Sequence, residues 1–128
     1  MNIKAPISLG ELIDKISILI IKKENITNKE QKLIVEKELG NLKVILKQTE
    51  IEENKLNYYL NDIKKINNKL WKVEDKIREC EKNAIFDNNF IELARSVYKN
   101  NDERARIKLK INTEFNSDII EIKSYKKY

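Results

Sequence analysis

The chain has 128 residues, with 26 basic and 21 acidic side chains, a net charge of +5, one Cys and no His. Without His there is no imidazole acid, base or metal ligand. A single Cys excludes an internal disulfide and a thiolate zinc site, and it makes the cytoplasm the expected compartment. The length fits one domain of ordinary size, so we expect a single helical domain over residues 1–128.

The positive charge is weak support for a nucleic-acid partner. Lys, Asn and Ile supply 59 of the 128 positions, whereas Arg appears only 4 times. Codon bias in an AT-rich genome produces this composition by itself. The acidic residues are scattered among the basic ones, without a block of like charges. We therefore do not expect a nucleic-acid partner. We expect no membrane partner either, because no segment is apolar over the ~18 residues of a span.

The elements expected along the chain are helices, because 2 Gly and 1 Pro leave few helix breakers. Ser8-Leu9-Gly10-Glu11 has the form of a capping box and predicts a first helix from about residue 9. Thr27-Asn28-Lys29-Glu30 repeats this pattern and predicts a second helix that runs to about Lys47. Gly40 lies inside the second helix, at a cost of about 1 kcal/mol relative to Ala.

The third segment carries the clearest pattern of the chain. Nine apolar residues recur at two heptad positions without one charge: Leu56, Ile63, Leu70, Ile77 and Ala84 at one, and Tyr59, Ile66, Val73 and Cys80 at the other. This spacing predicts a long helix that packs against a neighbour in coiled-coil fashion. A polar turn near 48–54 precedes it, so we expect an antiparallel hairpin with the second helix. Because Cys80 occupies one of these seam positions, it should be a small buried hydrophobe. With no His to activate it, we do not expect it to act as a nucleophile.

A fourth helix is expected from about Asp87 or Asn88 to Phe115. Residues 2–5 and 118–125 contain short alternations, which predict extended arms or one small strand pair. The predicted fold class is therefore all-α: an antiparallel helical bundle with a long coiled-coil-like hairpin and short extended N- and C-terminal arms.

The length of the heptad pattern also predicts an assembly. One small domain does not need so long an apolar seam. We therefore expect a homodimer, in which a second copy covers part of the seam or the edge formed by Trp71.

The fourth helix has an apolar stripe whose central positions are polar: Asn101, Arg104 and Lys108. An unpaired buried charge is very costly, so each cation must meet a carboxylate, a bound anion or water. Two interpretations stay open. One is an internal network of salt bridges that fixes the register of the helices. The other is a polar pocket, lined by these residues and Arg78, that receives a phosphate or carboxylate group.

Candidate acidic and polar partners lie on two helices: Glu11, Asp14 and Lys15 on one side of the first, and Trp71, Glu74 and Asp75 beside the heptad seam of the third. Glu74 and Arg78 are spaced to pair within their helix. All 4 Arg, including Arg95, fall in one 29-residue window, although the composition favours Lys. These positions are candidates for a role that only a guanidinium fills. Carboxylate pairs are common on solvated helices, so we expect no metal ion and no other cofactor.

Five stretches of the chain resemble a family of small bacterial proteins of unknown function: 5–15, 70–81, 90–98, 101–105 and 123–125. Proteins of this family are found near glycosyltransferase and tetratricopeptide-repeat proteins, which implies a role around surface-sugar assembly without assigning one. The resemblance transfers no catalytic residue. Its stretches contain most of the candidates above and add Asp102.

Two functions remain open at this point. The first is a non-enzymatic protein-interaction or accessory module with a protein partner. The alternative is a small-molecule anion-binding protein or enzyme, with a polar pocket inside the bundle for a phosphate- or carboxylate-bearing ligand. Helical enzymes that resemble chorismate mutase hold a dianionic substrate among Arg, Lys and Glu. Here the first helix has no Arg, so that likeness rests on the fold alone.

Overall fold

The computed structural model describes all residues from 1 to 128 and contains four α-helices and no strand. The helices are α1 (Leu9–Asn25), α2 (Lys29–Lys47), α3 (Glu53–Lys82) and α4 (Asn88–Glu114). The predicted all-α class is confirmed. Of the two alternatives for the chain ends, the extended arms are present and the strand pair is not. None of the four helices combines the length and hydropathy needed to cross a bilayer.

Local capping explains where three of the helices begin. The Ser8 side chain accepts a hydrogen bond from the backbone N–H of Glu11 at 3.1 Å, which is one of the two bonds of a capping box, while the Glu11 side chain binds Lys108. Asn28 caps α2 in the same way at 3.0 Å, so the cap lies one residue after Thr27. Asp87 caps α4, again at 3.0 Å.

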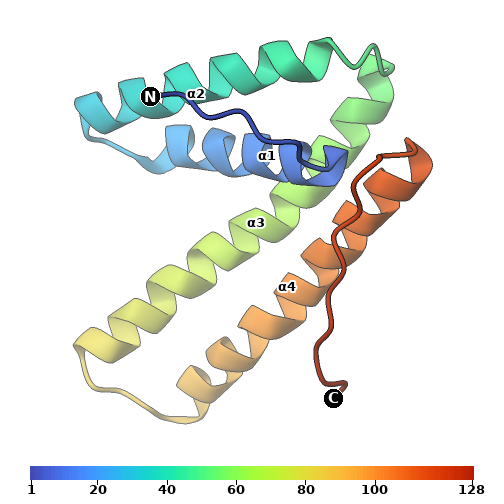
Figure 1. Ribbon diagram of the computed structural model, residues 1–128. Helices are drawn as coiled ribbons and strands as arrows, with labels where there is room; N and C mark the ends of the chain where they lie inside the picture. The colour runs from blue at the N-terminus through green and yellow to red at the C-terminus, as the bar shows by residue number, and fades with distance from the viewer.

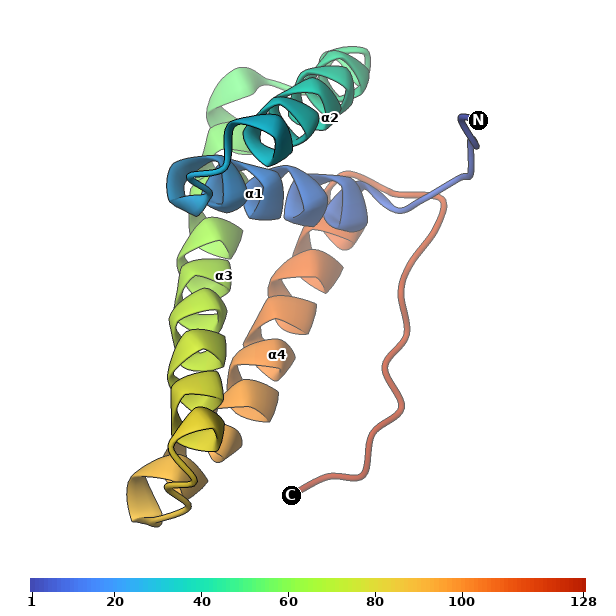
Figure 2. The ribbon, with the colours of Figure 1, turned by 90° about the vertical axis from the view of Figure 1, so that its left-hand side faces the viewer.

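The molecule consists of two helical hairpins (Figure 1). The α1–α2 hairpin lies across one end of the α3–α4 hairpin, whose other end projects beyond it (Figure 2). No Cα of α2 lies within 8 Å of a Cα of α3, so the predicted hairpin of the second and third helices is wrong. The partner of α3 is α4 instead. Both connections of α3 are short, so either neighbour could pair with it, but α4 with 27 residues covers more of the 30-residue α3 than α2 with 19 can.

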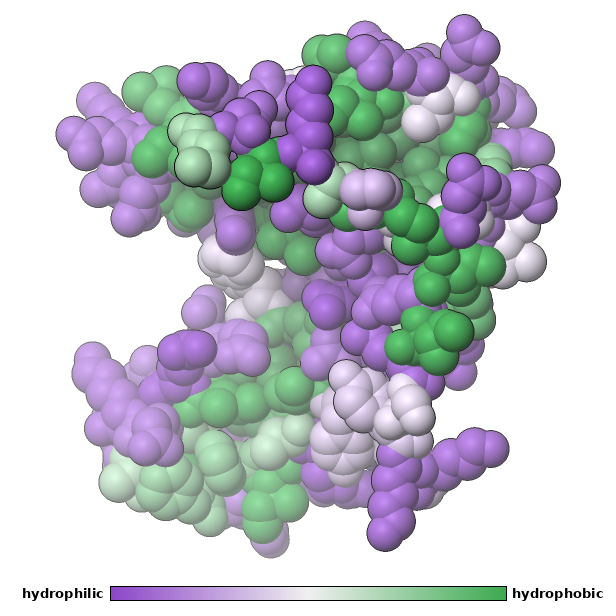
Figure 3. Space-filling model, in the orientation of Figure 1, coloured by the Kyte–Doolittle hydropathy of each residue, from purple (hydrophilic) through white to green (hydrophobic).

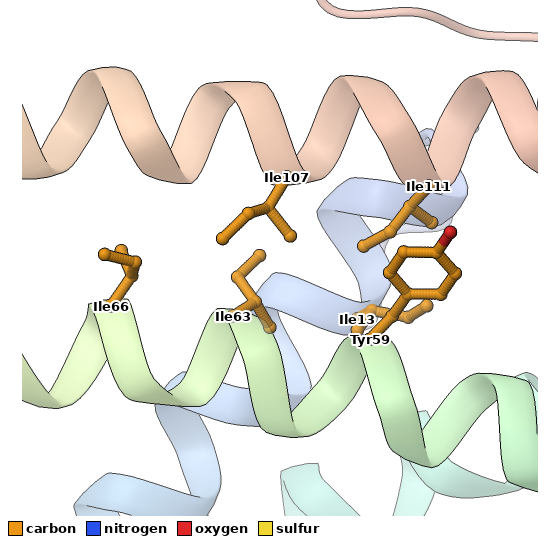
Figure 4. Close-up of a cluster of buried hydrophobic side chains, with 6 residues drawn as sticks. All are labelled: Ile13, Tyr59, Ile63, Ile66, Ile107 and Ile111. Carbon is orange, nitrogen blue, oxygen red and sulfur yellow. The ribbon is translucent and has the colours of Figure 1, made fainter.

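The core lies where the two hairpins cross. One cluster joins α1, α3 and α4, and Figure 4 shows its side chains pointing toward one another: Ile13, Tyr59, Ile63, Ile66, Ile107 and Ile111. A second cluster joins α1 to α2: Leu12, Ile16, Leu19, Val35 and Leu39. α1 contributes to both clusters, so it is the element that holds the two hairpins together.

The heptad seam of α3 faces α4 and is buried only in its first half. Tyr59, Ile63 and Ile66 are buried, whereas the seam residues from Leu70 to Cys80 are half-buried. Cys80, expected to be buried, is among the half-buried ones. The last heptad position, Ala84, lies beyond the end of α3 in the turn to α4, with a φ of 52°. The far part of the α3–α4 hairpin therefore has no third helix to complete a core.

Candidate functional site

Lys108 of α4 is a buried cation that is balanced by carboxylates from two other segments. Its side chain is 7% exposed, and its Nζ donates a hydrogen bond to Glu11 Oε2 of α1 at 2.6 Å. The same Nζ lies 2.6 Å from Glu121 Oε2 and 3.9 Å from Asp14 Oδ2. Burial alone lowers the pKa of Lys108, but the bonds to Glu11 and Glu121 outweigh it, and the net pKa is raised. Lys108 therefore stays charged in the interior.

A chain of polar contacts leads from Asp14 across α3 to Arg104. Asn67 donates through Nδ2 to Asp14 Oδ1 and to Ser17 Oγ, both at 2.7 Å. Its Oδ1 accepts a long bond of 3.5 Å from Arg104 Nη1. Arg104 is half-buried and takes part in none of the ion pairs of the structure. Carboxylates surround Lys108, but none pairs with Arg104.

α1 touches the backbone of α4 at Gly10, and this close contact positions the carboxylates of α1 beside Lys108. A Cβ on Gly10 would lie 2.7 Å from the carbonyl oxygen of Lys108 and 2.9 Å from Oδ1 of Asn112. The Gly10 N–H donates to that same Oδ1 at 2.7 Å. Only glycine allows this approach, and it brings Glu11, the next residue, beside Lys108.

Residues 116–128 form an extended strap that runs back along α4, antiparallel to it (Figures 1 and 2). The strap is tied near its start by Ser117 Oγ, which accepts a hydrogen bond from a backbone N–H of α1 at 3.2 Å. It is tied again by Glu121, which pairs with Lys108 and, at 2.7 Å, with Lys123. The bonds from Lys108 and then Lys123 lower the pKa of Glu121 to about 2. Glu121 is therefore ionised, and its ion pair with Lys108 holds the strap against α4.

The end of the strap is tied to α4 by Tyr128. Its hydroxyl donates to Asp102 Oδ2 at 2.7 Å, and its ring meets Tyr98 edge-on with centroids 5.2 Å apart. The bond to Asp102 raises the pKa of Tyr128, because the phenol is held in its protonated form. Residues 122–127 therefore bridge a space over α4 between two ties.

The space under the strap is a groove of about 920 Å³, which we call the strap groove. Its walls contain five cations, one carboxylate and three tyrosines: Arg104, Lys108, Lys123, Lys126, Lys127, Asp102, Tyr98, Tyr125 and Tyr128. Lys108 and Lys123 are paired with Glu121. Arg104, Lys126 and Lys127 take part in no ion pair. The groove therefore has a positive surplus that the chain does not neutralise.

A second hollow of about 420 Å³, which we call the notch, lies between α1 and the middle of the α3–α4 hairpin (Figure 3). Its lining contains four apolar and six polar residues: Ile18, Ile21, Leu70 and Trp71, and Asn67, Glu74, Asp75, Arg78, Asn101 and Arg104. Arg78 is 80% exposed, and its Nε lies 3.5 Å from Glu74 Oε2. Asn101 and Arg104 line the strap groove as well as the notch.

The structure thus brings most of the candidate residues to three neighbouring places. Trp71, Glu74, Asp75 and Arg78 line the notch, Asp102 lines the strap groove, and Glu11 and Asp14 lie beside Lys108. Two candidates lie apart: Arg95 pairs with Glu92 at 2.8 Å on the exposed surface, and Lys15 is exposed and in no ion pair. No three Cys, Asp or Glu side chains are grouped so as to hold a metal ion.

Three residues that shape this region were not found from the sequence. Asn67 is one of two consecutive amides beside the seam, Glu121 lies in a segment with only a short alternation, and Gly10 enters the prediction only as part of the capping box. Only Gly10 could have been found from the sequence. It is one of 2 glycines in the chain and lies in the first turn of a helix, which indicates a close contact that excludes a side chain.

These features define an all-α protein of two crossed helical hairpins, with an ion network where the hairpins meet. The chain belongs to a family of unknown function (DUF6165), whose model matches residues 3–128. No curated protein and no solved structure matches the chain. Family membership agrees with the resemblance noted from the motifs and brings no activity with it.

Proposed function

We propose that the protein is a non-enzymatic interaction module that acts as a homodimer through the outer face of α2. The observation that carries this proposal is that α2 packs on α1 alone but has two apolar faces. The inner face, with Val35 and Leu39, is buried. The outer face has four exposed residues: Leu33 (66%), Ile34 (68%), Val44 (57%) and Ile45 (48%).

The four outer residues are arranged to pair with a copy of themselves. Residues 11 apart complete about three helical turns, so Leu33 and Val44 lie in one row, and Ile34 and Ile45 in the next. The midpoint of the pair 33 and 44 and the midpoint of the pair 34 and 45 lie on either side of residue 39, within half a residue of it. Two antiparallel α2 helices related by a two-fold axis at this level would place each row against its own copy, with Leu33 near Val44 of the copy and Ile34 near Ile45. A Cβ on nearby Gly40 would meet nothing within 4 Å, so no side chain of the protein covers this position of α2.

The accessible area is large enough to accommodate a contact with a second copy. The chain exposes 9656 Å², whereas a compact monomer of 15.2 kDa exposes about 7,100 Å². A standard interface buries about 800 Å² on each partner, which this surplus accommodates. A row of exposed apolar side chains on one helix face is typical of a contact surface.

Light scattering coupled to gel filtration tests the proposal. At micromolar concentration we expect a mass near twice 15.2 kDa. The double substitution Ile34→Lys and Val44→Lys should give a monomer with unchanged helicity. The double substitution Asn57→Lys and Asn61→Lys on the exposed face of α3 adds the same charge and should leave the dimer intact. A monomeric native chain, or a dimer that both double variants retain, would reject this interface.

A further inference from the structure

We infer that the strap groove binds a small molecule that carries a phosphate group, and that Arg104 is its central contact. This inference does not depend on the dimer. It rests on the unpaired charge of Arg104, on the surplus of cations around it, and on the way in which the strap closes the groove.

Arg104 is the residue whose surroundings most need an anion. Its guanidinium is half-buried, and its single side-chain hydrogen bond, to Asn67, is at the long limit of 3.5 Å. Lys108, one turn further along the same face, has carboxylates of Glu11 and Glu121 at 2.6 Å. A cation removed from water needs such a partner, and a planar guanidinium fork matches the oxygens of phosphate.

The number of cations favours phosphate over a single carboxylate. Lys126 and Lys127 line the groove with Arg104, and none of the three takes part in an ion pair. A phosphate monoester carries about −1.5 to −2 charges near neutral pH, whereas a carboxylate carries one. The rings of Tyr98 and Tyr125 line the same groove and offer contact area to an organic group.

The strap favours a small molecule over a polymer. The groove is crossed at one end by the Glu121–Lys108 pair and at the other by the hydrogen bond from Tyr128 to Asp102. A nucleic-acid strand would have to thread between these ties or break both. The volume of about 920 Å³ lies within the range of about 300–1,000 Å³ typical of small-molecule sites.

Pyrophosphate is the probe for the first test, with sodium chloride at matched ionic strength as the reference. At ten times its dissociation constant, pyrophosphate should raise the melting temperature by about 5 °C above the chloride reference. Titration followed by ¹⁵N-resolved NMR should move the amide signals of residues 97–108 and 122–128. The signals of α2 should stay in place.

Three variants test the role of Arg104 and of the strap. Arg104→Met should weaken pyrophosphate binding about tenfold or more, the cost of one bond to a charged group. Arg106→Met removes an exposed cation two residues away, paired with Glu103, and should leave binding unchanged. The double substitution Lys126→Gln and Lys127→Gln, at exposed positions that cannot disturb the core, should also weaken binding.

Three results would overturn the inference. The first is the absence of any thermal or spectral change beyond the chloride reference. The second is a response that Arg104→Met and the double Lys variant leave intact, or that spreads over lysines throughout the chain. An inorganic sulfate titration separates phosphate selectivity from general anion binding, and equal responses to both anions would also reject a phosphate site.

Discussion

Replacing Lys108 by Met is the most direct test of the ion network. The substitution keeps an unbranched side chain, one atom shorter than that of Lys, and removes the charge that three carboxylates share. It leaves Asp14 buried, with a side chain only 5% exposed. It also removes the partner of Glu121, which ties the strap to α4. We therefore expect loss of global stability together with release of the strap.

The expected loss of unfolding free energy depends on how exposed the three carboxylates are once Lys108 is gone. Breaking a buried pair costs about 3–5 kcal/mol, because the remaining charge is left in the interior. Glu11 and Glu121 are 37% and 35% exposed, so both regain water, and Asp14 keeps its bond from Asn67. We therefore expect the lower end, about 3 kcal/mol, which corresponds to a melting temperature about 10 °C lower for a chain of this size.

Urea unfolding followed by circular dichroism measures this effect, with Lys110→Met as the matched control. Lys110 is two residues away, exposed and in no ion pair, so its substitution should change stability by less than about 0.5 kcal/mol. If Lys108→Met unfolds within about 1 kcal/mol of this control, the network does not stabilise the crossing of the hairpins.

Four further substitutions have outcomes that the structure predicts. Gly10→Ala should cost about 1–3 kcal/mol by overpacking, because its Cβ would lie 2.7 Å from a backbone oxygen, whereas Gly40→Ala should stabilise the chain by about 1 kcal/mol in urea unfolding. Asn67→Leu should cost about 2 kcal/mol by the same measurement, since it removes the bonds to Asp14 and Ser17 at 2.7 Å. Glu121→Gln should reduce acid sensitivity: the pKa of Glu121 is lowered from 4.5 to about 2, mainly by Lys108, so the stability that it contributes is present above pH 4.5 and is lost as the pH falls toward 2. A difference in unfolding free energy between native chain and variant that does not shrink between pH 4.5 and pH 2 would contradict this assignment.

The helices were predictable because their limits depend on neighbouring residues. Ser8 and Asp87 accept hydrogen bonds from the backbone of the helix that follows, and such caps are visible in a few letters of sequence. The end of α2 at Lys47 agrees with the expected position, because the polar turn that follows is also visible in the sequence. The shift of one cap from Thr27 to Asn28 shows the limit, because both side chains can serve.

The pairing of the helices was not predictable in the same way. The heptad seam of α3 shows that a partner exists, but the pattern does not identify it. The connections on its two sides, 48–52 and 83–87, have equal length, so proximity in the chain gave no preference. The choice depends on α1, which crosses α3 and α4 through Ile13 and occupies the side where a second hairpin partner would lie.

In the candidate site, too, the features local to one helix were predictable and the contacts between segments were not. Arg104 and Lys108 stood out because they interrupt an apolar stripe, which is a local feature of one helix. Their different surroundings depend on Glu121 and Asn67, which reach them from the strap and from α3. Neither contact leaves a periodic trace in the sequence, so only the folded chain separates the enclosed cation from the unpaired one.

Lys108 links the ion network to the strap groove, and this gives its substitution a second consequence. The residue pairs with Glu11 of the crossing helix and with Glu121 of the strap, and it lines the groove that contains Arg104. Lys108→Met should therefore weaken pyrophosphate binding as well as stability, because the strap that carries Lys126 and Lys127 loses one of its ties. Glu11→Gln removes only the partner on α1 and keeps the tie at Glu121. It should lower stability and leave pyrophosphate binding almost unchanged, so the pair of variants separates the role of Lys108 in folding from its role in holding the groove closed.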